Sequence, residues 1–514
     1  MPQGRLIQVV DVADQRSIAD YAAVAQLAPG VHELKAEAEA VLPRLEGRTV
    51  WMVSSTRQGG GVAEMLPPLV ALLRDLGVRV EWVVMGSDEP EFFDLTKHLH
   101  NLIHGAGTAR LGADARRLFE RVNRANAAEL LPRLSPGDVL LVHDPQPLPL
   151  AGMLRESLPL AAVWRCHIGL DTANDATRAA WEFLEPYLDA YDHAVFSAPE
   201  YIPARLAGHA TVIPPGIDPL APKNVDLSLR HAVELLCNGG LAVPPGPMLH
   251  QPFAAQARRL VADGVAAPAV EAGDIGLLTR PIVTQVSRWD RLKGWLPLLE
   301  AFAALKRSVG TGPSGDDPFH RRRLELARLV LAGPEPESIQ DDPEGLQVLE
   351  EVRAAHAALP PEVREDVAVV LLPMQSLEQN ALLVNALQRA STLVVQNSLR
   401  EGFGLTIAEA MWKRVPVLSN SRACGPRQQI RDGLDGRLVA DPEDVDGLRE
   451  ALDRTLAASE ARHRWGASGQ RRVHELFLVI AQLRRGGQLF ATLPVLPPVA
   501  NGAGAAAAQA TRVG

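Results

Sequence analysis

The stretch 391–413 reads STLVVQNSLREGFGLTIAEAMWK, and it decides the fold class. It begins with a short apolar run rich in β-branched residues, continues through a glycine-containing turn, and ends in a helical pattern. A buried strand followed at once by a helix is the repeating unit of parallel α/β sheets. Ligands of such sheets bind at the carboxyl ends of the strands, so this turn is a candidate ligand site.

The same alternation runs along most of the 514-residue chain, which is long enough for two domains. Strands are predicted at 48–55, 78–85, 138–144, 160–168, 193–198, 281–288, 326–333, 367–373, 391–398, 415–420 and 436–440. The proline-rich segment 210–224 interrupts the series. We therefore expect an α/β fold of two doubly wound domains, 1–220 and 221–470, that face each other across a cleft.

Three further segments complete the expected organisation. The segment 225–280 is predicted to be mostly helical, with a glycine–proline break at 239–247. The apolar spacing of 471–490 predicts one helix, extending to about 492, that packs back on the first domain. The segment 310–318 is predicted to be a surface loop, and the low-complexity tail 496–514 is predicted to be disordered.

Composition and charge exclude several classes of function. The net charge is −9, so no broad basic surface for nucleic acid is implied. No apolar stretch is long enough to span a bilayer, and the N-terminal residues carry acids where a signal peptide is apolar. Three cysteines without a CxxC pair argue against a disulfide framework, so a cytoplasmic location is expected. The oligomeric state is left open, with a homodimer as one option.

The glycine turn has the chemistry of an anion site. Gly402 and Gly404 allow close backbone approach, and the amides of Leu405 and Thr406 begin the following helix. Free amides at the positive end of a helix dipole suit a phosphate. The loop VSRWDRLKG (286–294) adds two cations, Arg288 and Lys293, at another predicted strand end. Two cations beside a helix N-terminus suit a diphosphate.

Two carboxylates flank the same turn. Glu401 lies in the turn and Glu409 lies further along the helix. Carboxylates accept paired hydrogen bonds from neighbouring hydroxyls, which a hexose and a ribose both present. Other polar residues follow the strands of the first half, namely His143, Asp144, Gln146, Arg165 and His167. Such a set suits a polyhydroxy acceptor, and the glycine triplet 59–61 allows sugar or phosphate to approach the backbone.

The two motifs of the second half together resemble the retaining glycosyltransferases of the GT-B fold, in the family that includes sucrose and glycogen synthases. Glu401 and Glu409 match the signature of two glutamates separated by seven residues, and 287–294 match SRxxxxKG. The phrases GGGVAE, HDPQP, WRCHI and REGFGLTIAEAMWK are similar to those of the nucleotide-sugar-dependent trehalose synthases in family 4 of these enzymes. The likeness covers roughly 48–225 and 280–490.

The resemblance implies a GT-B fold of two facing Rossmann-like domains and a reversible transfer of glucose from UDP- or ADP-glucose to glucose, with retention. It implies catalytic roles for His167, Glu401, Arg288 and Lys293. The implied donor-binding set is Gly60, Gly61, Arg288, Lys293, Gly402, Gly404, Leu405, Thr406 and Glu409, and the acceptor-binding set is Asp144, Gln146, Arg165 and His167. No cofactor or metal is expected, because the single DxD motif, 444–446, is interpreted as a helix cap.

Some alternatives stay open at the level of sequence. The segment SRACGPRQQIRDG (421–433) lacks the usual glycine pair, so only Gly425 and Gln428 or Gln429 stand in, and the nucleotide base is undecided. The length of 225–280 keeps a trehalose phosphorylase, or a transferase to another small acceptor, in consideration. A non-catalytic sugar- or nucleotide-binding regulator is disfavoured, because both glutamates, Arg288 and Lys293 are present.

Overall fold

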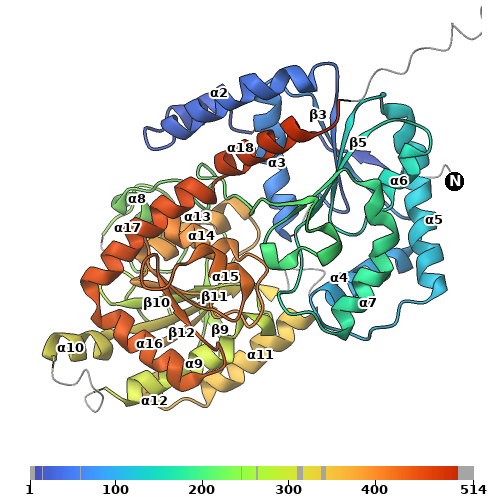
Figure 1. Ribbon diagram of the computed structural model, residues 1–514. Helices are drawn as coiled ribbons and strands as arrows, with labels where there is room; N and C mark the ends of the chain where they lie inside the picture. The colour runs from blue at the N-terminus through green and yellow to red at the C-terminus, as the bar shows by residue number, and fades with distance from the viewer. Residues whose placement is uncertain are drawn as a thin grey trace, which may run out of the picture. The chain divides into compact units, whose positions relative to one another are not determined.

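The computed structural model describes residues 6–495 except 14, 58–59, 245, 262–263, 310–316 and 337–342. The chain divides into two compact units (Figure 1). The first unit consists of the residues up to Ile213 and those after Gln482, and the second unit is Pro214–Gln482. The predicted tail and most of the predicted loop at 310–318 lie outside the described residues.

Within the described residues, seven strands form the sheet of the first unit, in the order β1-β3-β2-β4-β5-β6-β7. They are β1 (Gln8–Val9), β2 (Val50–Ser54), β3 (Val80–Val84), β4 (Val139–His143), β5 (Ala161–Cys166), β6 (His193–Phe196) and β7 (Ala210–Val212). β1 is antiparallel to β3 and the other pairs are parallel. Both β4 and β5 are buried along their whole length, in keeping with their mainly apolar sequence, and the polar exceptions His143 and Arg165 lie near their carboxyl ends. The strands predicted for this half are confirmed.

The helices of the first unit cover this sheet. They are α1 (Ile18–Ala22), α2 (Ala28–Leu45), α3 (Gly60–Asp75), α4 (Pro90–Ile103), α5 (Ala113–Leu130), α6 (Leu150–Arg155) and α7 (Asp175–Leu184), with the short 3-10 helices η1 (Leu131–Arg133), η2 (Glu185–Ala190), η3 (Pro199–Tyr201) and η4 (Ala204–Leu206). The last helix, α18 (Val479–Thr492), begins in the second unit and continues in the first. Arg484 of α18 forms ion pairs with Glu33 and Glu37 of α2, which hold it there.

Eight strands among the described residues form the sheet of the second unit, in the order β15-β14-β13-β10-β11-β12-β8-β9. They are β8 (Arg258–Leu260), β9 (Ala266–Pro268), β10 (Ile282–Val286), β11 (Arg328–Pro334), β12 (Val367–Leu372), β13 (Leu393–Val395), β14 (Val417–Asn420) and β15 (Arg437–Val439). The pairs from β15 to β12 are parallel, whereas β8 and β9 are antiparallel. The six strands predicted for this half are confirmed.

Helices lie on both faces of the second sheet (Figure 1). They are α8 (Leu229–Asn238), α9 (Trp295–Arg307), α10 (Pro318–Leu326), α11 (Pro343–Ala357), α12 (Pro361–Arg364), α13 (Leu377–Ala390), α14 (Leu405–Trp412), α15 (Cys424–Gln429), α16 (Val445–Ala457) and α17 (Ser459–Leu476), with η5 (Arg291–Lys293). Strand β11 shows how the two layers arise. Leu329 and Leu331 join one apolar core with α9 and α16, while Val330 and Ala332 join the other with α8 and α13.

Two predictions about secondary structure are wrong. Of the described residues in 225–280, only α8 forms an α-helix, because β8 and β9 form an antiparallel extension of the sheet beside β12. Alanine-rich sequence favours a helix locally, but pairing with a sheet edge and a turn at Gly264 (φ +79°) keep this segment extended. The helix predicted at 471–490 is interrupted between α17 and α18, where Leu478 pairs with Ile217 in a parallel bridge.

Candidate active site

The second unit brings the two predicted diphosphate- and sugar-binding segments together. Strands β10 and β13 are parallel neighbours, so the segments that follow them meet at the same edge of the sheet. Lys293 at the end of η5 places its Nζ 2.6 Å from Oε2 of Glu401 in the turn after β13. Ser398 Oγ donates a second hydrogen bond of 3.0 Å to the same oxygen. A lysine and a glutamate 108 residues apart in sequence thus form one ion pair.

Opposing effects set the charge of Glu401. Burial raises the pKa of its carboxyl, but the charge and hydrogen bond of Lys293, the hydrogen bond from Ser398 and the charge of Arg288 together hold the pKa below its usual value. Glu401 is therefore ionised at neutral pH. Arg288 itself is exposed. This cluster of Arg288, Lys293 and Glu401, which we call the charged cluster, carries two cations and one anion.

The glycine turn delivers backbone amides to the same place. Gly404 precedes α14 in the left-handed conformation, with φ of +81°, which favours glycine. A Cβ at this position would lie 2.9 Å from Cγ of Glu401. The N–H of Ile407 donates to the Gly404 carbonyl, so the amides of Leu405 and Thr406 precede the first hydrogen bond of the helix. These amides are placed as the sequence predicted.

The segment 421–433, which departs from the family pattern, contacts the glycine turn and supports its conformation. The N–H of Gly425 donates to the Glu401 carbonyl over 3.1 Å. A Cβ at Gly425 would lie 2.2 Å from the Phe403 carbonyl oxygen, so only glycine fits. The side-chain amide of Gln429 donates to the carbonyls of Phe403 and Gly404. Gly425 and Gln429 therefore fix the conformation of the turn.

Glu409 lies in α14, apart from the ion pair of Glu401. Its side chain is buried, with 5% relative exposure for the residue. Its Oε1 lies 3.8 Å from Nζ of Lys223, and within the described ranges its carboxylate accepts no hydrogen bond. A buried carboxylate with this capacity to accept is suited to bind hydroxyl groups of a ligand.

In the first unit, polar residues converge at the ends of β4 and β5. His143 at the end of β4 is in register with Arg165 of β5. Asp144 adopts a left-handed conformation, with φ of +63°, and its Oδ1 accepts a hydrogen bond of 2.8 Å from the N–H of His167. The rings of His143 and His167 are nearly parallel, and Nδ1 of His143 lies 3.1 Å from Nε2 of His167. We call these four residues the histidine cluster.

Burial sets the charge state of the histidine cluster. Burial, with the charge of Arg165 adding to it, lowers the pKa of His143 to about 3 and that of His167 well below its usual value. Both rings are thus neutral at pH 7, and a single N–H joins them. Burial raises the pKa of Asp144 to about 6, against the hydrogen bond from His167 and the charge of Arg165.

Three buried polar atoms of residues at or shortly after the ends of β4 and β5 lack a hydrogen-bond partner among the described residues. They are Nε2 of His143, Nδ1 of His167 and Oε1 of Gln146. Buried polar atoms are normally paired, so an unpaired set at strand ends marks a place where a ligand can supply the missing partners. Hydroxyl groups can do so, because each both donates and accepts.

The structure also places predicted residues that lie outside these two clusters. Gly60 and Gly61 begin α3, Gly59 lies outside the described residues, and the donor-binding role of the first two stays a prediction. Asp444 caps α16 by accepting a hydrogen bond of 3.0 Å from the N–H of Gly447, so the cap interpretation of the DxD motif is confirmed. In the part of the chain that the structure describes, no group of three or more His, Cys, Asp or Glu side chains could hold a metal.

Sequence reasoning missed three contributors. Ser398 follows β13 and bonds Glu401, so the rule that ligands gather after strands could have found it. The contact of His143 with His167 requires knowledge of which strands are neighbours. Lys223, beside Glu409, lies in a proline-rich connection without periodicity, so no local pattern marks it.

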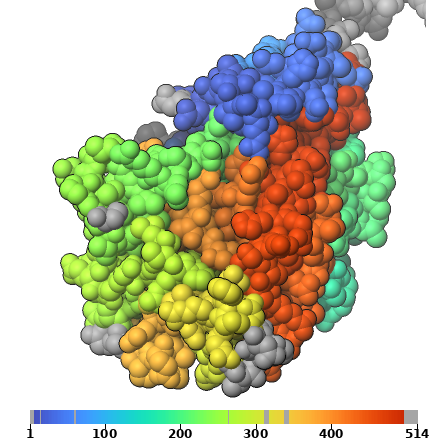
Figure 2. Space-filling view, turned by 90° about the vertical axis from the view of Figure 1, so that its left-hand side faces the viewer, coloured from blue at the N-terminus to red at the C-terminus, as the bar shows by residue number. Residues whose placement is uncertain are grey.

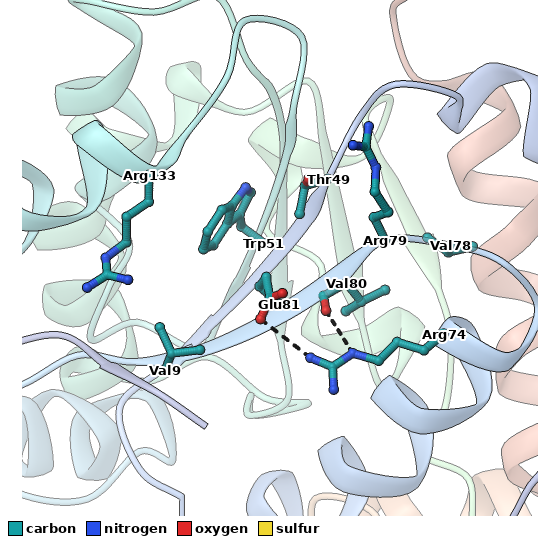
Figure 3. A pocket seen from close by; sticks show the side chains of 9 residues that line it. All are labelled: Val9, Thr49, Trp51, Arg74, Val78, Arg79, Val80, Glu81 and Arg133. Carbon is teal, nitrogen blue, oxygen red and sulfur yellow. Dashed lines mark hydrogen bonds and ion pairs between the residues drawn. The ribbon is translucent and has the colours of Figure 1, made fainter. Parts of the chain in front are cut away.

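A separate cavity of about 570 Å³ lies at the opposite end of the first sheet (Figure 3). It is lined by residues at the amino ends of β2 and β3 and on η1, including Thr49, Arg79 and Arg133. Arg74 in its wall bonds the Val80 carbonyl and forms an ion pair with Glu81 (Figure 3). None of its lining residues belongs to the predicted site.

The match to known proteins covers both units. Residues 52–203 match the family described as trehalose synthase, N-terminal domain, and residues 274–472 match glycosyl transferases group 1. The trehalose synthase of Pyrococcus horikoshii is 33% identical, over 86% of this chain and 89% of that protein. The trehalose phosphorylase of Pleurotus sajor-caju is 29% identical, over 76% of this chain but 50% of that protein.

A solved structure shows the same fold at lower identity. An E. coli structure described as trehalose-6-phosphate bound with UDP-2-fluoro glucose is similar with a TM-score of 0.61 and 16% identity, over 87% of this chain and 99% of that one. The prediction of a GT-B fold is confirmed. No helix of the described residues has the length and apolar character needed to cross a membrane. With near full-length matches at this identity, the chain belongs to the trehalose synthase family of glycosyltransferases.

Proposed function

We propose that this protein transfers glucose from a nucleotide diphosphate glucose, UDP- or ADP-glucose, to free glucose, and so forms trehalose with retention of configuration. Membership of the trehalose synthase family supports the reaction. The observation that carries the proposal for this chain is the ion pair of Lys293 and Glu401 beside Arg288. It joins cations for a diphosphate to a carboxylate for sugar hydroxyls.

The charged cluster binds the donor. Arg288 and Lys293 contact the diphosphate, and the amides of Leu405 and Thr406 add the positive end of α14. Glu401 is ionised and accepts hydrogen bonds from hydroxyls of the donor glucose. Glu409 accepts hydrogen bonds from the ribose. Gly402 and Gly404 allow the donor to approach the backbone.

The reaction exchanges one bond at the anomeric carbon of the donor glucose. The bond from this carbon to the phosphate oxygen breaks, and a bond to a hydroxyl oxygen of the acceptor forms on the same face. The proton of the acceptor hydroxyl passes to the departing phosphate oxygen. Negative charge grows on the diphosphate as it leaves, so Arg288 and Lys293 stabilise the transition state more than the bound substrate. No metal is needed for this role.

The histidine cluster serves the acceptor and the reacting end of the donor sugar. His167 is neutral, so it acts as a hydrogen-bonding group and not as an acid. Asp144, Gln146 and Arg165 offer both acceptors and donors to a polyhydroxy acceptor. The unpaired atoms of His143, His167 and Gln146 support this assignment.

One incubation tests the proposal. The purified protein is mixed with UDP-, ADP- or GDP-glucose and free glucose, and the products are separated. We expect a non-reducing disaccharide together with the free nucleoside diphosphate from UDP- or ADP-glucose. If no donor gives the disaccharide, or if the disaccharide reduces copper reagents, the proposed reaction is wrong.

The same purified protein distinguishes the proposed synthase from the two alternative functions. A phosphorylase would release glucose 1-phosphate from trehalose and inorganic phosphate without a nucleotide. This chain spans half the length of the phosphorylase that it matches, whereas it spans most of the synthase, which favours the synthase. A non-catalytic regulator would bind a nucleotide sugar without turnover, and the complete charged cluster argues against it.

We also propose a cytoplasmic location and activity without a cofactor. The three cysteines are buried and form no disulfide among the described residues, in keeping with a reducing compartment. Activity is expected to survive a chelator, and loss that Mg²⁺ restores would contradict this. A homodimer stays one option, which light scattering in solution decides.

A further inference from the structure

A buried lysine contacts the main chain of Glu409. Lys413 follows α14, and the residue is only 8% exposed. Its Nζ donates to Oε1 of Gln388 over 2.8 Å, to the Glu409 carbonyl over 3.0 Å and to Oδ1 of Asn224 over 3.3 Å. One ammonium therefore joins α14, α13 and the connection before α8.

One of the three partners of Lys413, Asn224, lies next to the predicted nucleotide contact at Glu409. Asn224 is the neighbour in sequence of Lys223, whose Nζ lies 3.8 Å from Oε1 of Glu409. The side-chain amide of Asn224 also donates to the Asp218 carbonyl over 2.9 Å. This hydrogen bond joins two residues of the connection before α8. Figure 2 shows the green segment with α8 lying against the orange segment with α13 on the surface of the second unit.

This arrangement is an unusual way to bury a charge. A buried ammonium is strongly unfavourable unless it is paired, and an acid is the usual partner. Within the described ranges, no carboxylate forms an ion pair with Lys413, and its three acceptors are neutral. By contrast, Lys306 in the same unit is also buried but pairs with Asp366 at 2.8 Å. A contribution to the stability of the fold is therefore a weak explanation for a lysine at position 413.

We propose that Lys413 is a positioning residue of the nucleotide site, and that Lys223 is a further donor-binding residue. Lys413 fixes the main chain at Glu409 and the side chain of Asn224, and so sets the separation of Glu409 and Lys223. Together these two present an acceptor and a cation to the nucleoside part of the donor. This inference rests on the proposed function of the charged cluster as a donor site.

The charged groups around Lys413 define a pH dependence. Those that face it are Glu409 on α14, Arg389 on α13 and Lys223 in the connection before α8. Burial lowers the pKa of Lys413 to about 7, Glu409 opposes this, and Arg389 and Lys223 add to it. An ammonium donates three hydrogen bonds, whereas the neutral amine donates at most two. Donor binding should therefore weaken as the pH rises above the pKa of Lys413.

The experiment compares three variants of the full chain. Lys413→Met removes the ammonium, Lys223→Met removes the partly exposed cation, and Lys306→Met is the matched control for loss of a buried lysine. UDP and ADP binding is measured by calorimetry, KM for the donor and kcat are measured from pH 6 to 9, and thermal unfolding shows which variants fold.

We expect Lys413→Met and Lys223→Met to raise Kd for the nucleotide and KM for the donor by about tenfold, with kcat changed much less. The rise of donor KM with pH should be absent in Lys413→Met. Lys306→Met should lower the melting temperature and leave KM unchanged. If Lys413→Met does not fold, Lys223→Met, whose side chain is partly exposed, carries the test.

Two failures are distinguishable. If the unaltered protein binds neither UDP nor ADP, the proposed function is wrong. If it binds nucleotide, but Lys223→Met and a folded Lys413→Met retain its affinity, the donor site stands and the positioning role is wrong. Equal effects of Lys413→Met and Lys306→Met on KM would also contradict the proposal.

Discussion

The charged cluster of the second unit and the histidine cluster of the first unit occupy equivalent places in their own sheets but differ in the charge of their central pair of side chains. Each lies where neighbouring parallel strands end, β10 and β13 in one case and β4 and β5 in the other. In the charged cluster, Lys293 keeps Glu401 ionised. In the histidine cluster, burial keeps His143 and His167 neutral. The same topology thus places a charged ion pair at one sheet edge and two neutral rings at the other, which fits the proposed binding of a diphosphate and of a sugar.

The largest expected effect on activity comes from substitutions in the charged cluster. Arg288→Ala or Lys293→Ala should lower kcat by about 100-fold to 1,000-fold, because a preorganised group that stabilises the leaving diphosphate is lost. Steady-state kinetics with the donor measures this. Arg291→Ala is the matched control, because Arg291 lies in the same loop but pairs with the partly exposed Glu351. Near-normal turnover in Arg288→Ala would remove the basis for the phosphate role.

Substitutions of the neutral histidines in the histidine cluster should lower activity less. His167→Ala, and His143→Ala through the loss of its ring partner, should lower kcat/KM by about tenfold, because one neutral hydrogen bond contributes on the order of 1 kcal/mol. The activity of both variants is compared with that of His209→Ala, a change of an exposed histidine in the same unit. A loss as large as that of Arg288→Ala would show that His167 acts through charge, contrary to its predicted neutrality.

The comparison also predicts how stability depends on pH. The pKa of His143 is lowered to about 3 from 6.5, so its contribution to stability is present above pH 6.5 and is lost as the pH falls toward 3. His167 acts in the same direction. The pKa of Asp144 is raised to about 6 from 3.8, so its contribution is present below pH 3.8 and is lost as the pH rises through 6.

As the pH drops from 6.5 to 4, His143 and His167 both lose their contribution to stability, whereas Asp144 alone gains one. The free energy of unfolding should therefore fall over this range. The slope for each histidine is at most about 1.4 kcal/mol per pH unit. Denaturant unfolding across this range measures it. His143→Gln should flatten the curve, and His209→Gln should not. A curve unchanged by His143→Gln would mean that the pair is not buried and neutral as described.

The smallest effect is expected outside both clusters. Asp444→Ala removes the cap of α16 and should lower the free energy of unfolding by about 1 kcal/mol, with kcat and KM unchanged. Thermal unfolding and a standard assay measure both quantities. A large loss of activity in this variant would instead favour a catalytic role for the DxD motif.

Most of the fold was predictable, because each strand of the two parallel sheets is a local apolar run. The exceptions depend on contacts between distant segments. The hairpin β8–β9 takes its conformation from the edge of β12, and the break before α18 takes its position from Ile217. Neither partner is visible in the local pattern of the segment that it changes.

The candidate site divides in the same way. Arg288, Lys293 and Glu401 belong to recognisable motifs, and the structure brings them together. Asp144 and His167 were predicted separately from two strand ends, and the register of β4 and β5 joins them. The positioning role proposed for Lys413 could not be predicted, because it rests on contacts with Asn224 and Gln388, which are far away in sequence.

We propose above all that the charged cluster binds the diphosphate of the donor. A crystal structure of the protein with UDP or ADP bound tests it most directly. We expect phosphate oxygens within hydrogen-bonding distance of Arg288 and Lys293, and the ribose at Glu409. A nucleotide bound elsewhere, with Lys293 still paired only to Glu401, would contradict it.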